Sequence, residues 1–258
     1  MRRPRIIPTL LLRRSGFIKT VRFDVPRYIG EAMNAVRIFN EKRADELIIL
    51  DVLATSERRP PDLLLLRDIV AECFMPVCYG GGVRSLADMD GLFKSGVEKV
   101  ALNAIAVEQP AIIRLAADRY GSSSVVVVID VARSPGGRLE VVTHRGKKSS
   151  GLDPIEHVKR VAGEGAGEIV VQSVDRDGTR HGYDIDLIRA VSSAVSVPVV
   201  ALGGAASIED LARACVVGGA SAASAGSMFV YYGRHDAVLI SLPELRDIMT
   251  AFASIGRA

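Results

Sequence analysis

Two glycine-rich turns give the first chemical signal in the sequence. Gly80-Gly81-Gly82 and Gly203-Gly204 each follow a short apolar run. Glycine lets backbone N–H groups approach an anion without a Cβ in the way, so such turns can cradle a phosphate group. One turn of this kind would more simply serve to reverse the chain. Two turns in matching places favour phosphate binding over that simpler interpretation.

The two turns belong to an internal repeat. The same interval of 122 residues separates Gly81 from Gly203 and Asn103 from Ala225. In each copy the glycines are followed by a helical segment, an apolar run and a further turn, so one half of the fold resembles a copy of the other. The natural ligand should therefore carry two phosphates. The expected phosphate-binding residues are Gly81, Gly82 and Asn103 in the first copy and Gly203, Gly204, Gly226 and Ser227 in the second.

Carboxylates follow two of the apolar runs, and one of them could transfer protons. Asp130 ends the run Val-Val-Val-Val-Ile-Asp, and partial burial at the rim of a sheet would poise it for proton transfer. The competing interpretation is an aspartate that caps a helix or binds a loop. Asp177, which precedes Gly178, lies beside a further possible anion-binding turn, and Asp175 is interpreted as a residue that organises this loop.

The elements that must position these residues alternate between apolar, β-branched runs and helical segments. Alternation of apolar strands with helices is typical of a parallel sheet covered by helices, and eight such units fit a closed (β/α)8 barrel. We expect an α/β protein, a single TIM-barrel domain over residues 1–258 with an internal half-barrel repeat. An open doubly wound sheet is the alternative, but G-x-G-x-x-G does not follow the first strand. Expected strands are Ile6–Leu12, Leu47–Val52, Pro76–Tyr79, Lys99–Asn103, Val125–Val131, Glu168–Ser173, Val197–Leu202 and Ser221–Ala225. Expected helices are Tyr28–Lys42, Asp62–Cys73, Leu86–Ser95, Pro110–Tyr120, Pro154–Gly163, Asp184–Ala194, Ile208–Val217 and Leu242–Ser254.

Four charged residues stand at the beginnings of expected strands, and we call them the charged ring: Arg5, Glu46, Lys99 and Glu168. In a barrel they would gather at the floor, which is the amino-terminal end of the strands. Buried charges are costly when unpaired, so these two cations and two anions should pair with one another. Spacing alone therefore favours a stabilising role at this end of the barrel.

Composition excludes several classes of protein. The 258 residues include 33 Lys+Arg against 30 Asp+Glu, a net charge of +3, and 48% are hydrophobic. These values exclude a disordered chain and give no argument for nucleic-acid binding. The three cysteines match no zinc pattern, and we expect neither a metal nor a cofactor. With no signal-like segment at its start, the chain is expected in the cytoplasm. The uncharged stretches 190–208 and 214–233 are broken by Gly, Ser and Pro, so no membrane span is expected.

Motifs along almost the whole chain match those of a known family. They are RIIP at 5–8, DELIILD at 45–51, the Gly-Gly-Gly stretch, EKVALN at 98–103, VVVVID at 125–130, GAGEIVVQSVDRDGT at 165–179 and GYD at 182–184. With them the chain resembles the cyclase subunit of imidazole glycerol phosphate synthase. The resemblance implies a TIM barrel that takes ammonia from a separate glutaminase docked at the barrel floor. The ammonia passes through the barrel and is used at the opposite face on a ligand with two phosphates.

The resemblance also assigns roles to residues of this chain. It implies that the charged ring is the gate through which ammonia enters the barrel, which outweighs the purely stabilising interpretation. Glu98 matches an acidic position that faces the glutaminase, and Lys19 matches a lysine that contacts the ligand. Asp130 matches one of the two aspartates that perform the family's acid–base chemistry.

The second of those aspartates is missing. It should fall at Leu11, which also lies near the half-barrel counterpart of Asp130 because 119 residues separate the two. Leucine cannot carry a proton, and loss of a general acid or base typically costs about 10²–10⁴-fold in rate. The chain is therefore similar to cyclase-like paralogues found in surface-polysaccharide (O-antigen) gene sets. The insertion Tyr231–Ile240 also fits that subgroup. That similarity implies ammonia delivery for converting an acetamido sugar into an acetamidino sugar, with a sugar amidotransferase as a further partner.

Three functions remain open. The first is an ammonia-delivering barrel subunit of a specialised glutamine amidotransferase complex, with cyclase activity reduced or lost. The second is a genuine cyclase subunit of histidine biosynthesis in which Asp177 or Asp51 supplies the missing carboxylate. The third is a scaffold without catalysis that only activates a glutaminase.

Overall fold

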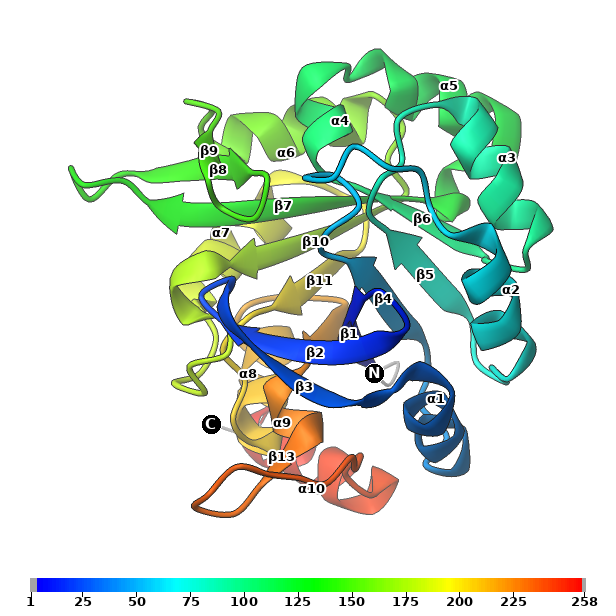
Figure 1. Cartoon of the computed structure of the whole chain (residues 1–258). Coiled ribbons are helices and arrows are strands. Elements are labelled where there is room, and N and C mark those ends of the chain that lie inside the picture. The colour runs from blue at the N-terminus through cyan, green and yellow to red at the C-terminus, as the bar shows by residue number, and fades with distance from the viewer. Residues whose placement is uncertain (1–3, 257–258) are drawn as a thin grey trace.

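The computed structural model describes residues 4–256 and contains a closed barrel of eight parallel strands (Figure 1). β1 pairs in parallel with β4 on one side and with β12 on the other, which closes the barrel. In order around the barrel the strands are β1 (Arg5–Arg13), β4 (Leu47–Asp51), β5 (Val77–Gly80), β6 (Lys99–Leu102), β7 (Val125–Arg133), β10 (Glu168–Ser173), β11 (Val199–Leu202) and β12 (Ala222–Ala225).

A helix follows each barrel strand and covers its outer side, so the expected (β/α)8 barrel is confirmed. These helices are α1 (Ala32–Glu41), α2 (Leu63–Ala71), α3 (Leu86–Lys94), α5 (Ala111–Tyr120), α6 (Pro154–Gly163), α7 (Ile185–Ala194), α8 (Ile208–Val216) and α10 (Leu245–Ile255). Shorter elements are α4 (Ala104–Glu108), α9 (Ser227–Val230) and the 3₁₀ turns η1 (Ser122–Ser124) and η2 (Val174–Arg176). Among the described residues, no helix combines the length and the apolar character needed to cross a membrane.

The two repeats have the same local structure. In the first, β5 leads through glycines into α3, β6 and the short helix α4, and in the second β11 leads into α8, β12 and the short helix α9. Ser85 caps α3 by accepting a hydrogen bond from the backbone N–H of Asp88, and Ser207 caps α8 in the same way with Asp210. Such a cap satisfies a free N–H of the first helical turn, so it fixes where each helix begins.

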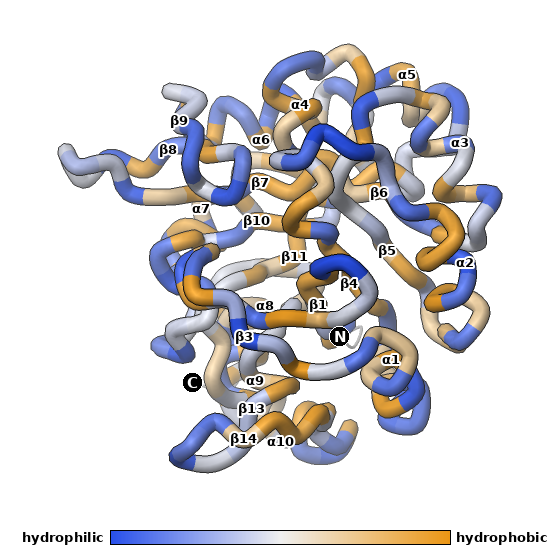
Figure 2. The backbone as a smooth tube through the Cα atoms, viewed as in Figure 1, coloured by the Kyte–Doolittle hydropathy of each residue, from blue (hydrophilic) through white to orange (hydrophobic). Residues whose placement is uncertain are grey.

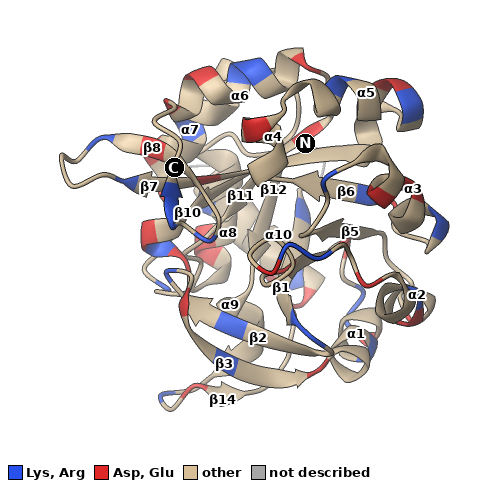
Figure 3. Ribbon diagram, turned by 45° about the horizontal axis from the view of Figure 1, so that its top comes forward, with Lys and Arg blue, Asp and Glu red and all other residues tan. Residues whose placement is uncertain are grey.

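Apolar residues of the strands face two different cores. Strand residues such as Leu10 and Tyr79 pack with the buried faces of the helices in one large cluster. Alternate residues, such as Ile7 and Cys78, form a second and smaller cluster that contains strand residues only and therefore fills the barrel interior. Figure 2 shows this pattern as apolar stretches along the strands and mixed colouring along the helices. Figure 3 shows most Lys, Arg, Asp and Glu on the outer helices and loops.

The first expected helix begins later than the sequence pattern indicates. Residues 16–31 form an antiparallel hairpin of β2 (Gly16–Val21) and β3 (Asp24–Glu31), and β2 continues from β1 by pairing with it. The expected helix from Tyr28 was therefore wrong over its first turn, because Tyr28 pairs with Ile18 of β2 and α1 starts only at Ala32. This pairing outweighs the local helical pattern.

Two further hairpins were not predicted. β7 extends beyond its expected end and pairs with β8 (Leu139–Thr143), which pairs in turn with β9 (Lys148–Ser149). The insertion at 231–240 contains the small hairpin of β13 (Tyr231–Tyr232) and β14 (Ala237–Val238). The hairpin formed by β8 and β9 follows the carboxyl end of a barrel strand, so it adds walls to the end where ligands bind in such folds.

Candidate functional site

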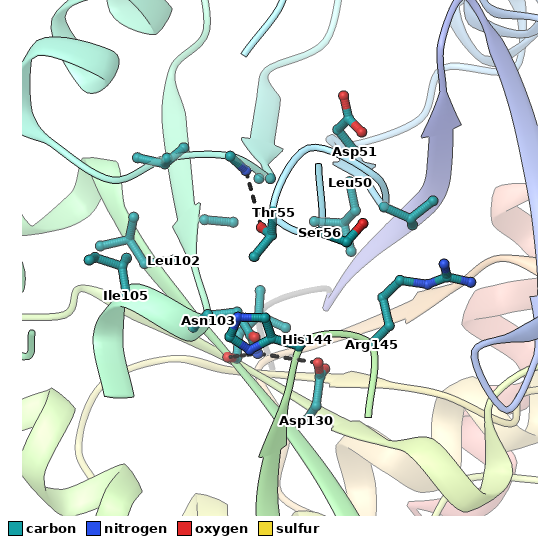
Figure 4. Close-up of a pocket in the computed structure, with 18 of the residues that line it drawn as sticks. Leu50, Asp51, Thr55, Ser56, Leu102, Asn103, Ile105, Asp130, His144 and Arg145 are labelled. Carbon is teal, nitrogen blue, oxygen red and sulfur yellow. Dashed lines mark hydrogen bonds between the residues drawn. The ribbon is translucent and has the colours of Figure 1, made fainter. Parts of the chain in front are cut away.

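A cavity of about 710 Å³ lies at the carboxyl ends of the barrel strands (Figure 4). Its walls come from the ends of β1, β4, β5, β6, β7 and β10 and from the loops that follow. Seven of the residues singled out in the sequence line it: Leu11, Asp51, Gly80, Gly81, Gly82, Asn103 and Asp130.

Asp130 is the ionisable group at the base of this cavity whose pKa is most suited to proton transfer. Burial and the nearby charge of Asp177 raise the pKa of Asp130 to about 7, while a hydrogen bond from Asn103 opposes this rise. Asn103 Nδ2 donates to Asp130 Oδ2 at 3.2 Å and to the carbonyl oxygen of Val128 at 3.0 Å (Figure 4). Oδ1 of Asp130 has no hydrogen-bond partner among the described residues. A carboxyl group with this pKa can both give and accept a proton near neutral pH.

Leu11 faces the same cavity from the opposite wall. β1 and β7 lie across the barrel from each other, since three strands separate them in either direction. Leu11 on β1 and Asp130 on β7 both line the cavity and are both 8% exposed. The wall that faces Asp130 therefore offers a hydrocarbon side chain where acid–base chemistry would require an ionisable one.

Asp51 lines the cavity, but other groups already bind its carboxylate. Its Oδ1 accepts hydrogen bonds from the backbone N–H groups of Leu53 and Ala54, both at 3.0 Å. Arg59 Nη2 lies 2.8 Å from the same carboxylate in an ion pair. Because Asp51 holds its own loop together, it is a poor replacement for the missing aspartate.

Asp177 is buried but does not line the cavity. It accepts a hydrogen bond from Gln172 Nε2 at 3.3 Å, and Gln172 is the cavity-lining residue. Burial raises the pKa of Asp177, whereas the positive charge of Lys19 opposes the rise. Gly178 is packed so closely against β2 that an added Cβ would lie 2.2 Å from the carbonyl oxygen of Thr20. Asp177 and Gly178 thus sit beneath the β2–β3 hairpin.

The first glycine turn opens into the cavity. Gly81 and Gly82 have φ angles of +116° and +72°, which are strained for residues with a side chain. An added Cβ would lie 2.4 Å from the carbonyl oxygen of Asp51 at Gly81 and 2.6 Å from that of Arg59 at Gly82. Glycine is required here both for the turn and for the close approach of the neighbouring loop. Asn103, which precedes α4, borders the same space.

The second glycine turn is arranged differently. Gly203, Gly204, Gly226 and Ser227 follow β11 and β12 as expected, but none of them lines the cavity. The ammonium group of Lys19 occupies the space beside Gly226, where an added Cβ would lie 1.8 Å from Nζ. Burial lowers the pKa of Lys19, and the charge of Asp177 opposes this effect. Of the two expected phosphate-binding sets, the one with Gly226 is therefore filled by the Lys19 side chain. The one with Gly81 and Gly82 opens into the cavity.

The charged ring closes the floor of the barrel. Lys99 Nζ lies 2.9 Å from carboxylate oxygens of both Glu46 and Glu168, and Arg5 is paired with the same two glutamates, 2.5 Å from Glu46. Burial by itself would lower the pKa of Lys99, but hydrogen bonds and charges of the two glutamates raise it. Each cation therefore contacts both anions, as the cost of buried unpaired charge led us to expect.

Small and apolar side chains fill the barrel between the charged ring and the cavity. The inner cluster consists of Ile7, Ile48, Cys78, Ala101, Val126, Val128, Val170, Val200, Leu202 and Ala222, with Leu50 packed against it. Polar groups of the interior bind each other: Thr9 Oγ1 lies 2.5 Å from Ser224 Oγ. Such an interior disfavours ions much more strongly than small neutral molecules.

Glu98 is exposed at the floor, next to Lys99 in the sequence. Its Oε2 accepts a hydrogen bond from the backbone N–H of Val77 at 2.7 Å. The carboxylate thus fixes the start of β5 as well as facing outward.

Sequence reasoning missed the basic residues at the cavity mouth. They are Arg58, Arg84, His144, Arg145 and Lys148. His144 and Arg145 come from the turn between β8 and β9 and line the same cavity as Asn103 and Asp130 (Figure 4). The alternation of Leu139–Thr143 followed by His-Arg-Gly was the signal for this hairpin. No group of three or more potential metal ligands was found within residues 4–256.

Most of the chain matches known proteins of one family. The family model described as "Histidine biosynthesis protein" matches residues 5–236. A Pseudomonas aeruginosa protein provisionally named imidazole glycerol phosphate synthase subunit hisF2 is 44% identical over 252 residues, which cover 96% of this chain and 99% of that protein. The imidazole glycerol phosphate synthase subunits HisF of Hyphomonas neptunium and Alkaliphilus metalliredigens are 44% and 40% identical, with coverage of 89% and 94% of this chain and 90% and 94% of those proteins.

Proposed function

The chain belongs to the histidine biosynthesis protein family, and we propose that it is a HisF-like barrel subunit of a glutamine amidotransferase complex in the cytoplasm. In this proposal a glutaminase docks at the floor and releases ammonia at the charged ring. Ammonia crosses the barrel interior and leaves at the cavity. The acceptor is a polysaccharide sugar, converted from acetamido to acetamidino by a sugar amidotransferase.

The properties of the barrel interior support transport of ammonia rather than ammonium. Ammonia is neutral and small, so an interior of aliphatic side chains and one cysteine imposes little desolvation cost on it. The charged ring closes this interior at the floor, and passage requires one of its ion pairs to open. Lys99 is the candidate for this movement because its flexible side chain contacts both glutamates through a single nitrogen.

The observation that carries the specialised role is Leu11 facing Asp130 across the cavity. Cyclisation by this family implies two acid–base groups, and here one wall provides only Asp130. Asp51 is bound by its own loop and Arg59, and Asp177 lies outside the cavity lining. We therefore expect the pocket to retain binding of a phosphorylated ligand at Gly81 and Gly82 but to have little cyclase activity.

The test is cyclase turnover of the isolated protein with ammonium salt and the bisphosphorylated ribulosyl aminoimidazole carboxamide substrate of the histidine pathway. Ammonium bypasses the glutaminase, so turnover reports on the cavity alone. We expect no turnover from the wild type and a gain of roughly 10²–10⁴-fold from Leu11→Asp. A matched control is Leu11→Asn, which is similar in size but cannot exchange a proton. Efficient turnover by the wild type would overturn the specialised role.

A genuine cyclase subunit is the second candidate, and the electrostatic influence of Asp177 on Asp130 favours it. The charge of Asp177 contributes to the raised pKa of Asp130, so the charge state of Asp177 affects proton transfer by Asp130. If Asp177 replaces the missing aspartate, the wild type should turn over and Asp177→Asn should abolish that turnover.

A further inference from the structure

An aromatic side chain stands almost fully in solvent between α2 and β5. Phe74 is 89% exposed, the highest value among the large hydrophobic side chains of the described residues. Single exposed apolar residues are common, and exposure alone would carry little meaning. Phe74 differs from such residues because hydrogen bonds fix the loop that carries it.

The loop that carries Phe74 is held firmly. Asn40, near the end of α1, uses both ends of its amide on this loop: Oδ1 accepts from the backbone N–H of Phe74 at 2.9 Å, and Nδ2 donates to the carbonyl oxygen of Glu72. Cys73 Sγ donates to the carbonyl oxygen of Ile69 at 3.3 Å. The backbone on both sides of Phe74 is thus fixed, while its side chain is left almost entirely exposed to solvent in the described part of the chain.

Phe74 lies at the floor of the barrel, beside the charged ring. It lies three residues before the start of β5, and β5 stands between β4 and β6 in the barrel. Glu46 lies directly before β4 and Lys99 begins β6, so the loop with Phe74 enters the floor between these two members of the charged ring. A protein that covers the charged ring would therefore meet Phe74.

Charged groups border the aromatic ring on this end of the molecule. Glu72 pairs with Arg37 at 3.0 Å, and Glu98 is exposed one strand further around the barrel. A rigid aromatic group with a charged border matches the usual anatomy of a protein interface, in which an apolar centre is surrounded by polar residues.

We propose that Phe74 is the anchor residue through which this chain binds its glutaminase, inserting into an apolar pocket on that partner. This inference rests on the proposed function and adds the chemistry of the interface. The pocket carries a basic group at its edge opposite the exposed Glu98, whereas Glu72 is already paired with Arg37 of this chain. Fixation by Asn40 reduces the conformational entropy lost on binding, since the loop is already in its bound form.

The test uses the full-length chain and the glutaminase encoded beside it, with affinity measured by isothermal titration calorimetry. We expect Phe74→Ala to weaken binding roughly 10- to 100-fold, as is usual for a buried aromatic anchor. Leu64→Ala is the matched control, because Leu64 is 69% exposed at the opposite end of α2 and should leave affinity unchanged. Asn40→Ala should weaken binding less than Phe74→Ala does, because it releases the loop without removing the ring. Circular dichroism confirms that the variants are folded.

The outcomes separate this inference from the proposed function. If the wild type binds the glutaminase and Phe74→Ala binds equally well, the anchor is wrong while the proposed function stands. If the wild type does not bind the glutaminase at all, the proposed function fails and the anchor fails with it. If the wild type instead forms dimers that Phe74→Ala disrupts in analytical ultracentrifugation, the partner is a second copy and the inference is overturned.

Discussion

At the floor of the barrel each member of the charged ring contacts two groups of opposite charge. At the other end Asp130 has a neutral amide on one oxygen and, within residues 4–256, no hydrogen-bond partner on the other. Both ends hold buried ionisable groups, yet the pKa of Glu168 is lowered and that of Asp130 is raised. Pairing compensates for desolvation at the floor, and desolvation prevails at the cavity. Ionisable groups are thus stabilising at one end and destabilising at the other, where their reactivity is useful.

Removing one charge from the ring should give the largest effect. Glu168→Gln leaves two partly buried cations with one anion, and we expect it to lower the free energy of unfolding by about 3–5 kcal/mol at pH 7. The measurement is urea denaturation followed by circular dichroism. Glu156→Gln is the matched control, since Glu156 forms an exposed ion pair with Lys159 and should change stability little.

The pH dependence of this effect follows from the pKa of Glu168. Burial alone would raise that pKa, but hydrogen bonds and charges of Arg5 and Lys99 lower it. A carboxyl group with a lowered pKa stabilises the fold above its unfolded pKa, and the stabilisation is lost as the pH falls through the folded pKa. The difference between wild type and Glu168→Gln should therefore shrink below about pH 4. A constant difference down to pH 2 would contradict the ionic role of the ring.

The same type of substitution at the cavity should have the opposite sign. Asp130→Asn removes a buried charge that lacks compensation, and we expect the free energy of unfolding to rise by about 2–4 kcal/mol at pH 8. Because the folded pKa of Asp130 is raised to about 7, the gain should appear between pH 4 and pH 7 and vanish at lower pH. Asp118→Asn, on an exposed helix position, is the control with no expected change. Destabilisation at pH 8 would show that Asp130 is structural.

The contrast between the ends also marks what the sequence could predict. Arg5, Glu46, Lys99 and Glu168 stand at strand starts, so alternation of elements and the cost of unpaired charge were sufficient to predict their pairing. The barrel itself followed from the same alternation. At the cavity, the outcome depends on contacts between distant segments. Away from the cavity, a strand pairing overrode a local pattern as well: the pairing of Tyr28 with Ile18 turned an expected helical turn into part of a hairpin.

Lys19 shows why the second phosphate cradle could not be predicted in detail. The repeat places Gly203 opposite Gly81 and Ala225 opposite Asn103, with Gly226 directly after Ala225. The backbone follows that prediction, because both glycine turns lead into a helix, a strand and a short helix. The position of the Lys19 ammonium beside Gly226 depends on how β2 packs across the loops after β10 and β12. That packing joins residues far apart in the chain, and no local pattern encodes it.

The smallest predicted effect tests whether the two ends work together. Lys99→Ala opens the charged ring, and if ammonia crosses the barrel, part of it should escape at the floor. We expect the ratio of amidated sugar to glutamate formed to fall roughly tenfold, equivalent to about 1.4 kcal/mol, in a reaction with the glutaminase and the sugar amidotransferase. Thermal denaturation checks that the variant is folded at the assay temperature, and product formation from added ammonium should remain at the wild-type rate. A scaffold that only activates the glutaminase would lose no coupling, because its ammonia never enters the barrel. An unchanged ratio would therefore favour the scaffold and leave the charged ring with its stabilising role alone.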